Sequence, residues 1–198
     1  MNENKQMSSY SAAVVLLHGS GASGKDMELV FASLTKNAAV AHIKFVFPTA
    51  PTRAYTLAGG MKLPVWFDRD RLDLRCKEDD SGIADSIAKS ASSMNLPRSP
   101  STIAVVEVVK SLESEGIPQA RIVVAGFSMG GCLALYIHQA LPQLAGCFTI
   151  GSFLPSASRL FKNTDSDGKA DSKLRSPLLM LHGIHDSMIR PAWATATR

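Results

Sequence analysis

The segment from Arg121 to His138 constrains this chain more than any other. It reads as an apolar run that ends at Ala125, then Gly126-Phe-Ser-Met-Gly130, then a second apolar run. A serine between two glycines, at a sharp turn from a strand into a helix, is raised above the edge of a sheet. The pattern alone arises by chance in roughly one chain of this length in fifteen, so the flanking strand and helix carry the signal. Ser128 is therefore the candidate nucleophile, and a serine that only caps the helix is the alternative.

Strand and helix patterns alternate along the chain. Apolar runs predict strands at Ala12–His18, Ile43–Phe47, Arg121–Ala125, Gly146–Ile150 and Leu178–His182. Helices are predicted after a capping Ser23 (with Met27, Val30, Phe31 and Leu34 on one apolar face), at Asp79–Met94 and at Thr102–Glu115, and an irregular loop at Thr49–Phe67. This alternation predicts an α/β fold, with a mostly parallel sheet and helices on both faces. A length of 198 residues suits a single domain, 1–198.

Composition narrows the possible functions. Charged residues make up 19% and hydrophobic residues 45% of the chain, which are values of a globular protein. The net charge is +4, but lysine and arginine are scattered, so we expect no nucleic-acid partner. Three cysteines without a C-x-x-C pair favour a reducing compartment and a cytoplasmic location. The apolar run at 12–17 is too short for a signal peptide or an integral membrane segment.

A glycine-rich turn, His18-Gly-Ser-Gly21, follows the first predicted strand. Hydrolases with a serine elbow hold the reaction oxyanion with two backbone N–H groups. One belongs to the residue after the nucleophile, and the other to an early loop between a strand and a helix. This predicts an oxyanion hole made by Met129 and Ser20. A phosphate-binding loop is the alternative, but these glycines do not complete G-x-G-x-x-G with a ribose-binding acid at the right distance.

Asp186 ends the last predicted strand, in His182-Gly-Ile-His-Asp186. A triad acid would orient a histidine from this place, and an aspartate that caps the next turn is the alternative. The order serine, acid, histidine places the general base after Asp186, where the chain has no histidine. His182 ends the strand and His185 adjoins the aspartate, so neither is expected to reach between Asp186 and Ser128.

Asn163–Gly168 resembles the start of a calcium-binding loop. The twelfth position is Leu174 instead of the bidentate glutamate, and no helices are expected on either side. We therefore predict a solvated loop, no metal site and no cofactor.

Five motifs in order resemble the acyl-protein thioesterase and lysophospholipase family, and the resemblance spans 12–193. They are Leu17–Gly21, Pro48–Pro51, Trp66–Asp68, Gly126–Gly131 and His182–Asp186. Met129 and the Trp66–Arg69 run look most like the lysophospholipase-like protein 1 branch. The resemblance implies the α/β-hydrolase fold and a cytosolic serine hydrolase acting on thioesters or esters, with an acylated protein or a lipid ester as substrate.

The same resemblance gives each candidate residue a role. It implies Ser128 as nucleophile, Asp186 as acid, Ser20 and Met129 as oxyanion donors, and Trp66 near the substrate pocket. The family's histidine motif, last strand and terminal helix should follow Trp193 and do not. We therefore expect a C-terminally truncated fold, lacking that strand and helix, with almost no turnover. The alternative is a catalytically inactive hydrolase that binds acyl groups or a partner.

Overall fold

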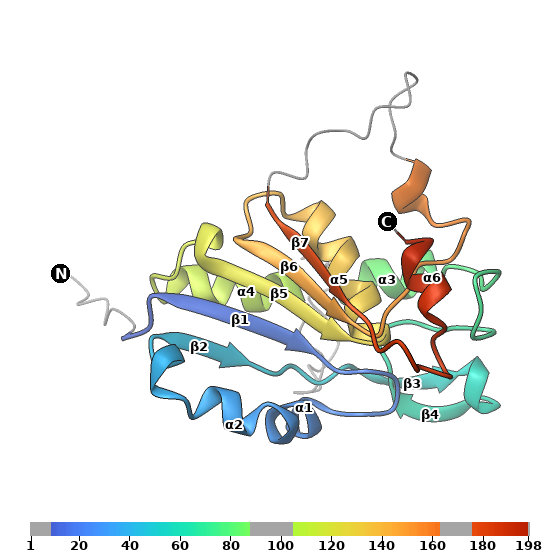
Figure 1. Cartoon of the computed structure of the whole chain (residues 1–198), viewed down its shortest axis with the longest axis horizontal. Coiled ribbons are helices and arrows are strands. Elements are labelled where there is room, and N and C mark those ends of the chain that lie inside the picture. The colour runs from blue at the N-terminus through green and yellow to red at the C-terminus, as the bar shows by residue number, and fades with distance from the viewer. Residues whose placement is uncertain (1–8, 88–104, 163–175, 198) are drawn as a thin grey trace, which may run out of the picture.

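The computed structural model describes residues 9–87, 105–162 and 176–197. Its main sheet has the strand order β2-β1-β5-β6-β7, and every neighbouring pair is parallel (Figure 1). The strands are β1 (Ala12–Leu17), β2 (Ile43–Val46), β5 (Ile122–Phe127), β6 (Gly146–Ile150) and β7 (Leu178–Leu181). All the strands that the apolar runs predict are therefore present, with small shifts at their ends.

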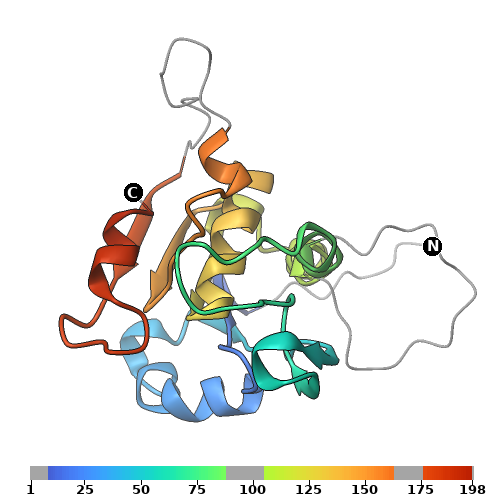
Figure 2. The same ribbon diagram turned by 90° about the vertical axis from the view of Figure 1, so that its right-hand side faces the viewer.

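Helices cover both faces of this sheet, as predicted (Figures 1 and 2). The helices are α1 (Gly24–Val30), α2 (Ala32–Thr35), α3 (Asp80–Ile87), α4 (Val105–Ser114), α5 (Met129–Ala140) and α6 (Pro191–Thr195); 3-10 turns are η1 (Ala38–Val40), η2 (Thr56–Ala58), η3 (Gln119–Arg121) and η4 (Arg159–Lys162). Neighbouring residues of β1 point to opposite faces. Leu16 packs with Met27 of α1, whereas Val15 and Leu17 belong to the main core, which includes side chains of α4 and α5.

The start of α1 agrees with the sequence prediction, whereas the predicted apolar face of this helix is not buried as a whole. The Ser23 side chain accepts a hydrogen bond from Asp26 N, and the Asp26 carboxylate accepts one from Ser23 N at 2.8 Å, so the predicted cap is confirmed. Val30 and Leu34, however, are 74% and 45% exposed. The helix ends at Phe31, and α2 starts anew there, so the 3.6-residue period does not continue through Leu34.

The prediction of an irregular loop at 49–67 is wrong. This segment contains an antiparallel hairpin of β3 (Thr52–Tyr55) and β4 (Met61–Pro64). Gly59 and Gly60 adopt φ values of 64° and 83°, which glycine reaches without steric cost, and they allow the chain to reverse. The Gly-Gly pair was thus a hairpin signal.

Three predictions reach beyond the described residues. The predicted helix at 79–94 is described only up to Ile87, and the predicted helix at 102–115 only from Val105. The calcium-loop-like segment 163–168 lies outside the described residues altogether. Within the three described ranges, no group of three His, Cys, Asp or Glu side chains is placed to hold a metal ion. No helix in those ranges is long and apolar enough to cross a membrane.

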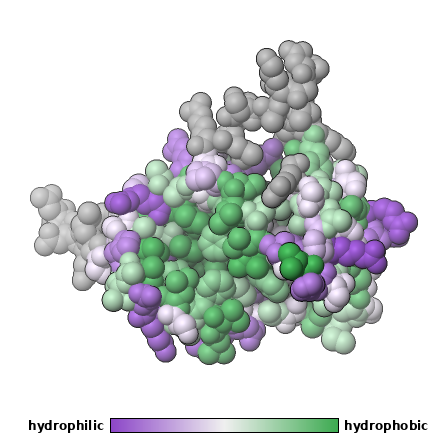
Figure 3. Space-filling model, viewed as in Figure 1, coloured by the Kyte–Doolittle hydropathy of each residue, from purple (hydrophilic) through white to green (hydrophobic). Residues whose placement is uncertain are grey.

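One face of the sheet is open toward β7. Strand register places Phe148 beside Leu179, and Ile150 between Phe127 and Leu181. These side chains lie on the face of the sheet against which α1 packs. Phe127, Leu179 and Leu181 are 47%, 56% and 45% exposed. We call these five residues the open sheet face. In Figure 3, much of this side of the molecule is green, the colour of hydrophobic residues. Because β7 ends the described sheet, apolar surface and an unpaired strand edge lie together.

Candidate active site

Ser128 sits in a strained turn between β5 and α5. It has φ 52° and ψ −118°, and among the described residues no other non-glycine residue has a positive φ. A Cβ on Gly126 would collide with the backbone of Gly130, and a Cβ on Gly130 would lie 2.6 Å from the carbonyl oxygen of His18. Strand and helix therefore cross too closely for any residue larger than glycine, and the predicted elbow is present.

The backbone of Ser128 is held from β6 and from α5. Ser128 N donates to Ile150 O at 2.9 Å, and Ser128 O accepts hydrogen bonds from Ser152 Oγ at 2.9 Å and Cys132 N at 3.1 Å. In the part of the chain that the structure describes, Ser128 Oγ itself makes no hydrogen bond. Its hydroxyl is thus free to approach a carbonyl carbon while its backbone stays fixed.

The structure brings the two predicted oxyanion residues to the same place. The Ser20 hydroxyl lies 3.7 Å from Met129 Sδ, and the Cβ position of Gly19 lies 3.3 Å from Ser128 Cβ. Met129 is the first residue of α5, where a backbone N–H has no partner within its helix. The Ser20 N–H makes no hydrogen bond within the described ranges. Both N–H groups can therefore receive an oxyanion, and that role remains a prediction.

A histidine that the sequence reasoning gave no role supports this loop. His18 is fully buried; its Nε2 accepts a hydrogen bond from Ala50 N at 2.9 Å, so Nδ1 carries the proton and donates to Gly19 O at 2.7 Å. Burial lowers the pKa of His18 below 6.5, which favours this neutral ring. The signal in the sequence was its place directly before the glycine-rich turn.

Trp66 lies beneath the same loop. It is 1% exposed, its indole N–H donates to His18 O at 2.8 Å, and the two ring centroids are 5.0 Å apart. These contacts make Trp66 a support of the loop, while its expected role near the substrate pocket stays a prediction. Arg69 fastens this segment to α5: its buried guanidinium lies 4.7 Å from the Phe153 ring centroid and donates to Cys132 Sγ at 3.6 Å.

Asp186 follows β7 and is held by its own loop. Its Oδ1 accepts hydrogen bonds from Met188 N at 3.0 Å and Ile189 N at 2.8 Å. Its Oδ2 lies 3.6 Å from the Cβ position of Gly151, which directly follows β6. One oxygen is thus fixed by backbone donors, and the other is directed toward the end of the strand next to Ser128. A triad acid needs this arrangement to orient an imidazole.

None of the chain's five histidines links Asp186 to Ser128 by hydrogen bonds. His182 Nε2 lies 3.5 Å from Asp186 Oδ2, but it donates to Ile189 O at 2.7 Å, and its buried Nδ1 has no partner among the described residues. His138 bonds Ser176 at the far end of α5, and His42 and His185 are exposed. The structure therefore assembles a candidate nucleophile, acid and oxyanion donors, but shows no base in contact with both.

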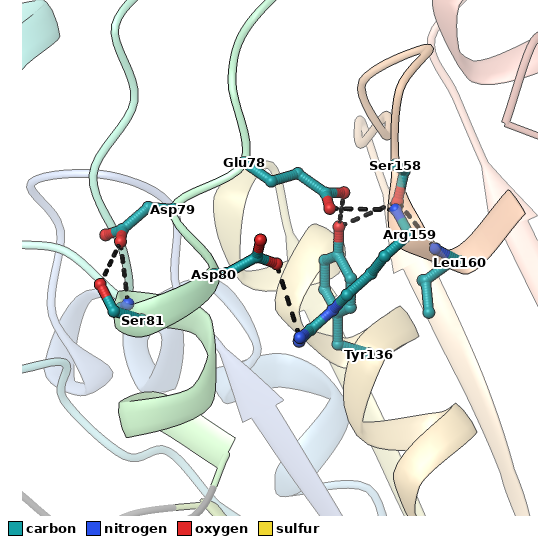
Figure 4. A network of polar contacts seen from close by, with 9 residues as sticks. Glu78, Asp79, Asp80, Ser81, Tyr136, Ser158, Arg159 and Leu160 are labelled. Atoms are coloured by element: carbon teal, nitrogen blue, oxygen red, sulfur yellow. Dashed lines mark hydrogen bonds and ion pairs between the residues drawn. The ribbon is translucent and has the colours of Figure 1, made fainter. Parts of the chain in front are cut away.

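A polar network braces α5 on the side of the loop before α3 (Figure 4). The Tyr136 hydroxyl donates to the Glu78 carboxylate and lies 3.0 Å from Ser158 Oγ. The same carboxylate accepts a hydrogen bond from Arg159 N at 3.0 Å, and the Arg159 guanidinium lies 3.5 Å from Asp80. Burial raises the pKa of Tyr136, so its hydroxyl remains a donor. Two segments that are distant in sequence, 78–80 and 158–159, are thereby tied to each other and to the helix that begins after Ser128.

Comparison with known proteins gives consistent matches. The model of the Phospholipase/Carboxylesterase family matches residues 4–198. Lysophospholipase-like protein 1 of Mus musculus is 35% identical over 191 residues, which cover 95% of this chain and 72% of that protein. Acyl-protein thioesterase 1 homolog 1 of Dictyostelium discoideum is 32% identical over 192 residues, or 96% of this chain and 75% of the relative.

Solved structures share the fold. Arabidopsis thaliana SOBER1 superposes with a TM-score of 0.72 at 21% identity, covering 93% of this chain and 80% of that one. Zea mays acyl-protein thioesterase 2 gives a TM-score of 0.70 at 24% identity, with coverages of 95% and 77%. Together with the family match, these similarities identify the sheet and its helices as an α/β-hydrolase fold.

Proposed function

Because this chain belongs to the phospholipase/carboxylesterase family, we propose that it is a serine hydrolase that cleaves an acyl ester or thioester through Ser128. The observation that carries the proposal is the φ of 52° at Ser128. A serine accepts such a backbone only where the surrounding structure enforces it, and strain of this kind concentrates at catalytic positions. The Ser128 hydroxyl is free of hydrogen bonds in the described part of the chain and lies beside Ser20 and Met129, which also supports an acyl-transfer site.

The reaction follows from this geometry. Ser128 Oγ attacks the acyl carbonyl, and the N–H groups of Ser20 and Met129 stabilise the oxyanion of the tetrahedral intermediate. Collapse expels the alcohol or thiol and leaves an ester on Ser128, which water then hydrolyses to the free acid. In a complete triad, a histidine held by Asp186 takes the serine proton and passes it to the leaving group.

The leaving group decides which class of substrate reacts best. A thiol, with a pKa near 8.5, leaves as the anion far more readily than an alcohol. We therefore propose thioesters, such as an S-acylated protein, ahead of lipid esters such as lysophospholipids, with no cofactor and in the cytoplasm.

The second candidate is an acyl-binding protein without turnover. It is favoured by His182, whose Nε2 donates to Ile189 O and whose Nδ1 has no partner in the described part of the chain. Such a ring belongs to the β7 loop, and it does not activate Ser128. The protein would then hold an acyl group at the elbow without transferring it.

Thioester hydrolysis with added imidazole separates the two candidates. Imidazole in solution can serve as the base, so turnover of an octanoyl thioester by residues 1–198 should rise with imidazole concentration and vanish in Ser128→Ala. No Ser128-dependent turnover at any imidazole concentration would favour the binding protein. Activity that needs no imidazole and is abolished by His182→Gln would reassign the base to His182.

A further inference from the structure

The carbonyl oxygen of Gly19 has two hydrogen-bond donors. It accepts hydrogen bonds from His18 Nδ1 at 2.7 Å and from Ala22 N at 3.2 Å. The peptide before it is also fixed, because Trp66 Nε1 donates to His18 O at 2.8 Å. Both peptide planes that flank Gly19 are thus held by side chains, although the residue itself is a glycine.

The hydrogen bonds to the Gly19 carbonyl also fix the direction of the Ser20 N–H group, because the peptide that joins them is planar. In a planar trans peptide, the carbonyl and the following N–H point to opposite sides. Holding Gly19 O toward the His18 ring therefore directs the Ser20 N–H away from that ring. Gly19 lies against Ser128, with its Cβ position 3.3 Å from Ser128 Cβ, so the Ser20 N–H is fixed at the edge of the site.

His18 also lies close to the support of the other predicted oxyanion donor, the Met129 N–H. The Cα of Gly130 is so close to the end of β1 that a Cβ there would lie 2.3 Å from Leu17 O and 2.6 Å from His18 O. Gly130 directly follows Met129, so the first turn of α5 packs on the carbonyl that Trp66 also binds. His18 is therefore in contact with the supports of both predicted N–H donors.

We propose that His18 is a positioning residue whose Nδ1–H, through the Gly19 carbonyl, aims the Ser20 N–H at the oxyanion formed on Ser128. The inference rests on the proposed function for the identity of the oxyanion. The ring acts as a neutral donor on one nitrogen and an acceptor on the other, and it takes no proton from the substrate. Its contribution is orientation, which an oxyanion hole requires before the charge develops.

Two amide substitutions of His18 distinguish the positioning role from simple packing. In His18→Asn, the amide nitrogen takes the place of Nδ1 and can donate to Gly19 O. In His18→Gln, the longer amide takes the place of Nε2 and can accept from Ala50 N, but nothing reaches Gly19 O. His42→Asn is the matched control, since His42 is an exposed histidine before β2.

The test compares the rate at which a fluorophosphonate modifies Ser128 in these full-length variants, because the phosphonyl oxygen takes the place of the oxyanion. We expect His18→Asn and His42→Asn to react within about threefold of the unaltered chain, and His18→Gln to react at least about tenfold more slowly, toward the loss seen when one oxyanion donor is removed. Equal rates for the asparagine and glutamine variants would overturn the proposal.

A second readout keeps the result independent of reactivity. Nitrogen NMR of His18 should show a protonated Nδ1 and an unprotonated Nε2, and hydrogen exchange at Ala22 N should be faster in His18→Gln than in His18→Asn. If the unaltered chain does not react with the probe, the proposed function fails, and exchange at Ala22 still decides the positioning role. Exchange that is the same in both variants would contradict it.

Discussion

Ser152 donates a hydrogen bond of 2.9 Å from its hydroxyl to the carbonyl oxygen of Ser128. Ser152 follows β6, so the sheet holds the strained residue from the strand next to its own. The peptide after Ser128 is thereby held in place, with the Met129 N–H on its other end. The same contact thus helps to hold both the strained residue and the N–H group that is predicted to bind the oxyanion.

Replacing Ser128 by glycine should stabilise the protein. Glycine adopts φ 52° without steric cost, so Ser128→Gly should raise the free energy of unfolding by about 1 kcal/mol over Ser128→Ala. Urea denaturation of both variants measures this difference. Equal stability, or a less stable glycine variant, would show that the turn is not strained in solution.

Tyr136→Phe should destabilise the fold. The substitution removes the hydroxyl that joins Glu78 and Ser158. The polar atoms of these two side chains then lose a hydrogen-bond partner in a largely buried part of the protein. We expect a loss of about 1–3 kcal/mol in the free energy of unfolding. Lys25→Met, which removes one side of the exposed ion pair with Glu28, is the control and should change stability by under about 0.5 kcal/mol. A loss no larger than that of the control would mean that the network of Figure 4 does not brace α5.

Stability should fall as the pH drops below about 6.5. Burial lowers the pKa of both His18 and His138 in the folded protein, whereas in the unfolded chain they titrate near 6.5. The unfolded state therefore binds more protons below that pH, and folding is disfavoured; above it the contribution is constant. The urea concentration at the midpoint of unfolding, measured from pH 5 to 8, should fall toward low pH. The fall should be smaller in His18→Asn. A flat profile over this range would contradict the burial of the two rings.

The open sheet face should make the protein associate. Exposed apolar side chains beside an unpaired strand edge favour contacts between copies. Leu179→Lys should therefore reduce concentration-dependent association in sedimentation velocity experiments. Leu57→Lys changes a leucine on η2 that is 41% exposed, and it should leave association unchanged. A monomer at all concentrations, or an equal effect of both lysines, would refute this assignment of the interface.

The parts of the molecule that follow from local patterns were predictable. The apolar runs locate every strand of the main sheet, and the glycines around Ser128 predict the elbow because only glycine permits that strand–helix crossing. The β3–β4 hairpin was missed because Thr52–Pro64 lacks strict apolar alternation. Its Gly59-Gly60 turn was the available signal.

Other features depend on contacts between distant residues. The role of His18 is visible only when Ala50 and Trp66 lie against it, and their sequence separations are 32 and 48. The exposure of Val30 results from the end of α1 at Phe31, which periodicity alone does not locate. The three-segment network around Tyr136 has no local sequence signature at all.

The most direct test of the account is whether Ser128 becomes acylated. Residues 1–198 are mixed with a p-nitrophenyl ester, and the intact mass and the modified residue are followed over time. We expect one acyl group per chain, on Ser128, and none in Ser128→Ala. The acyl group should accumulate because no histidine among the described residues bridges Asp186 and Ser128 to speed its hydrolysis. An unmodified Ser128, or an acyl group on another residue at the same rate, would contradict the assignment of Ser128 as the nucleophile.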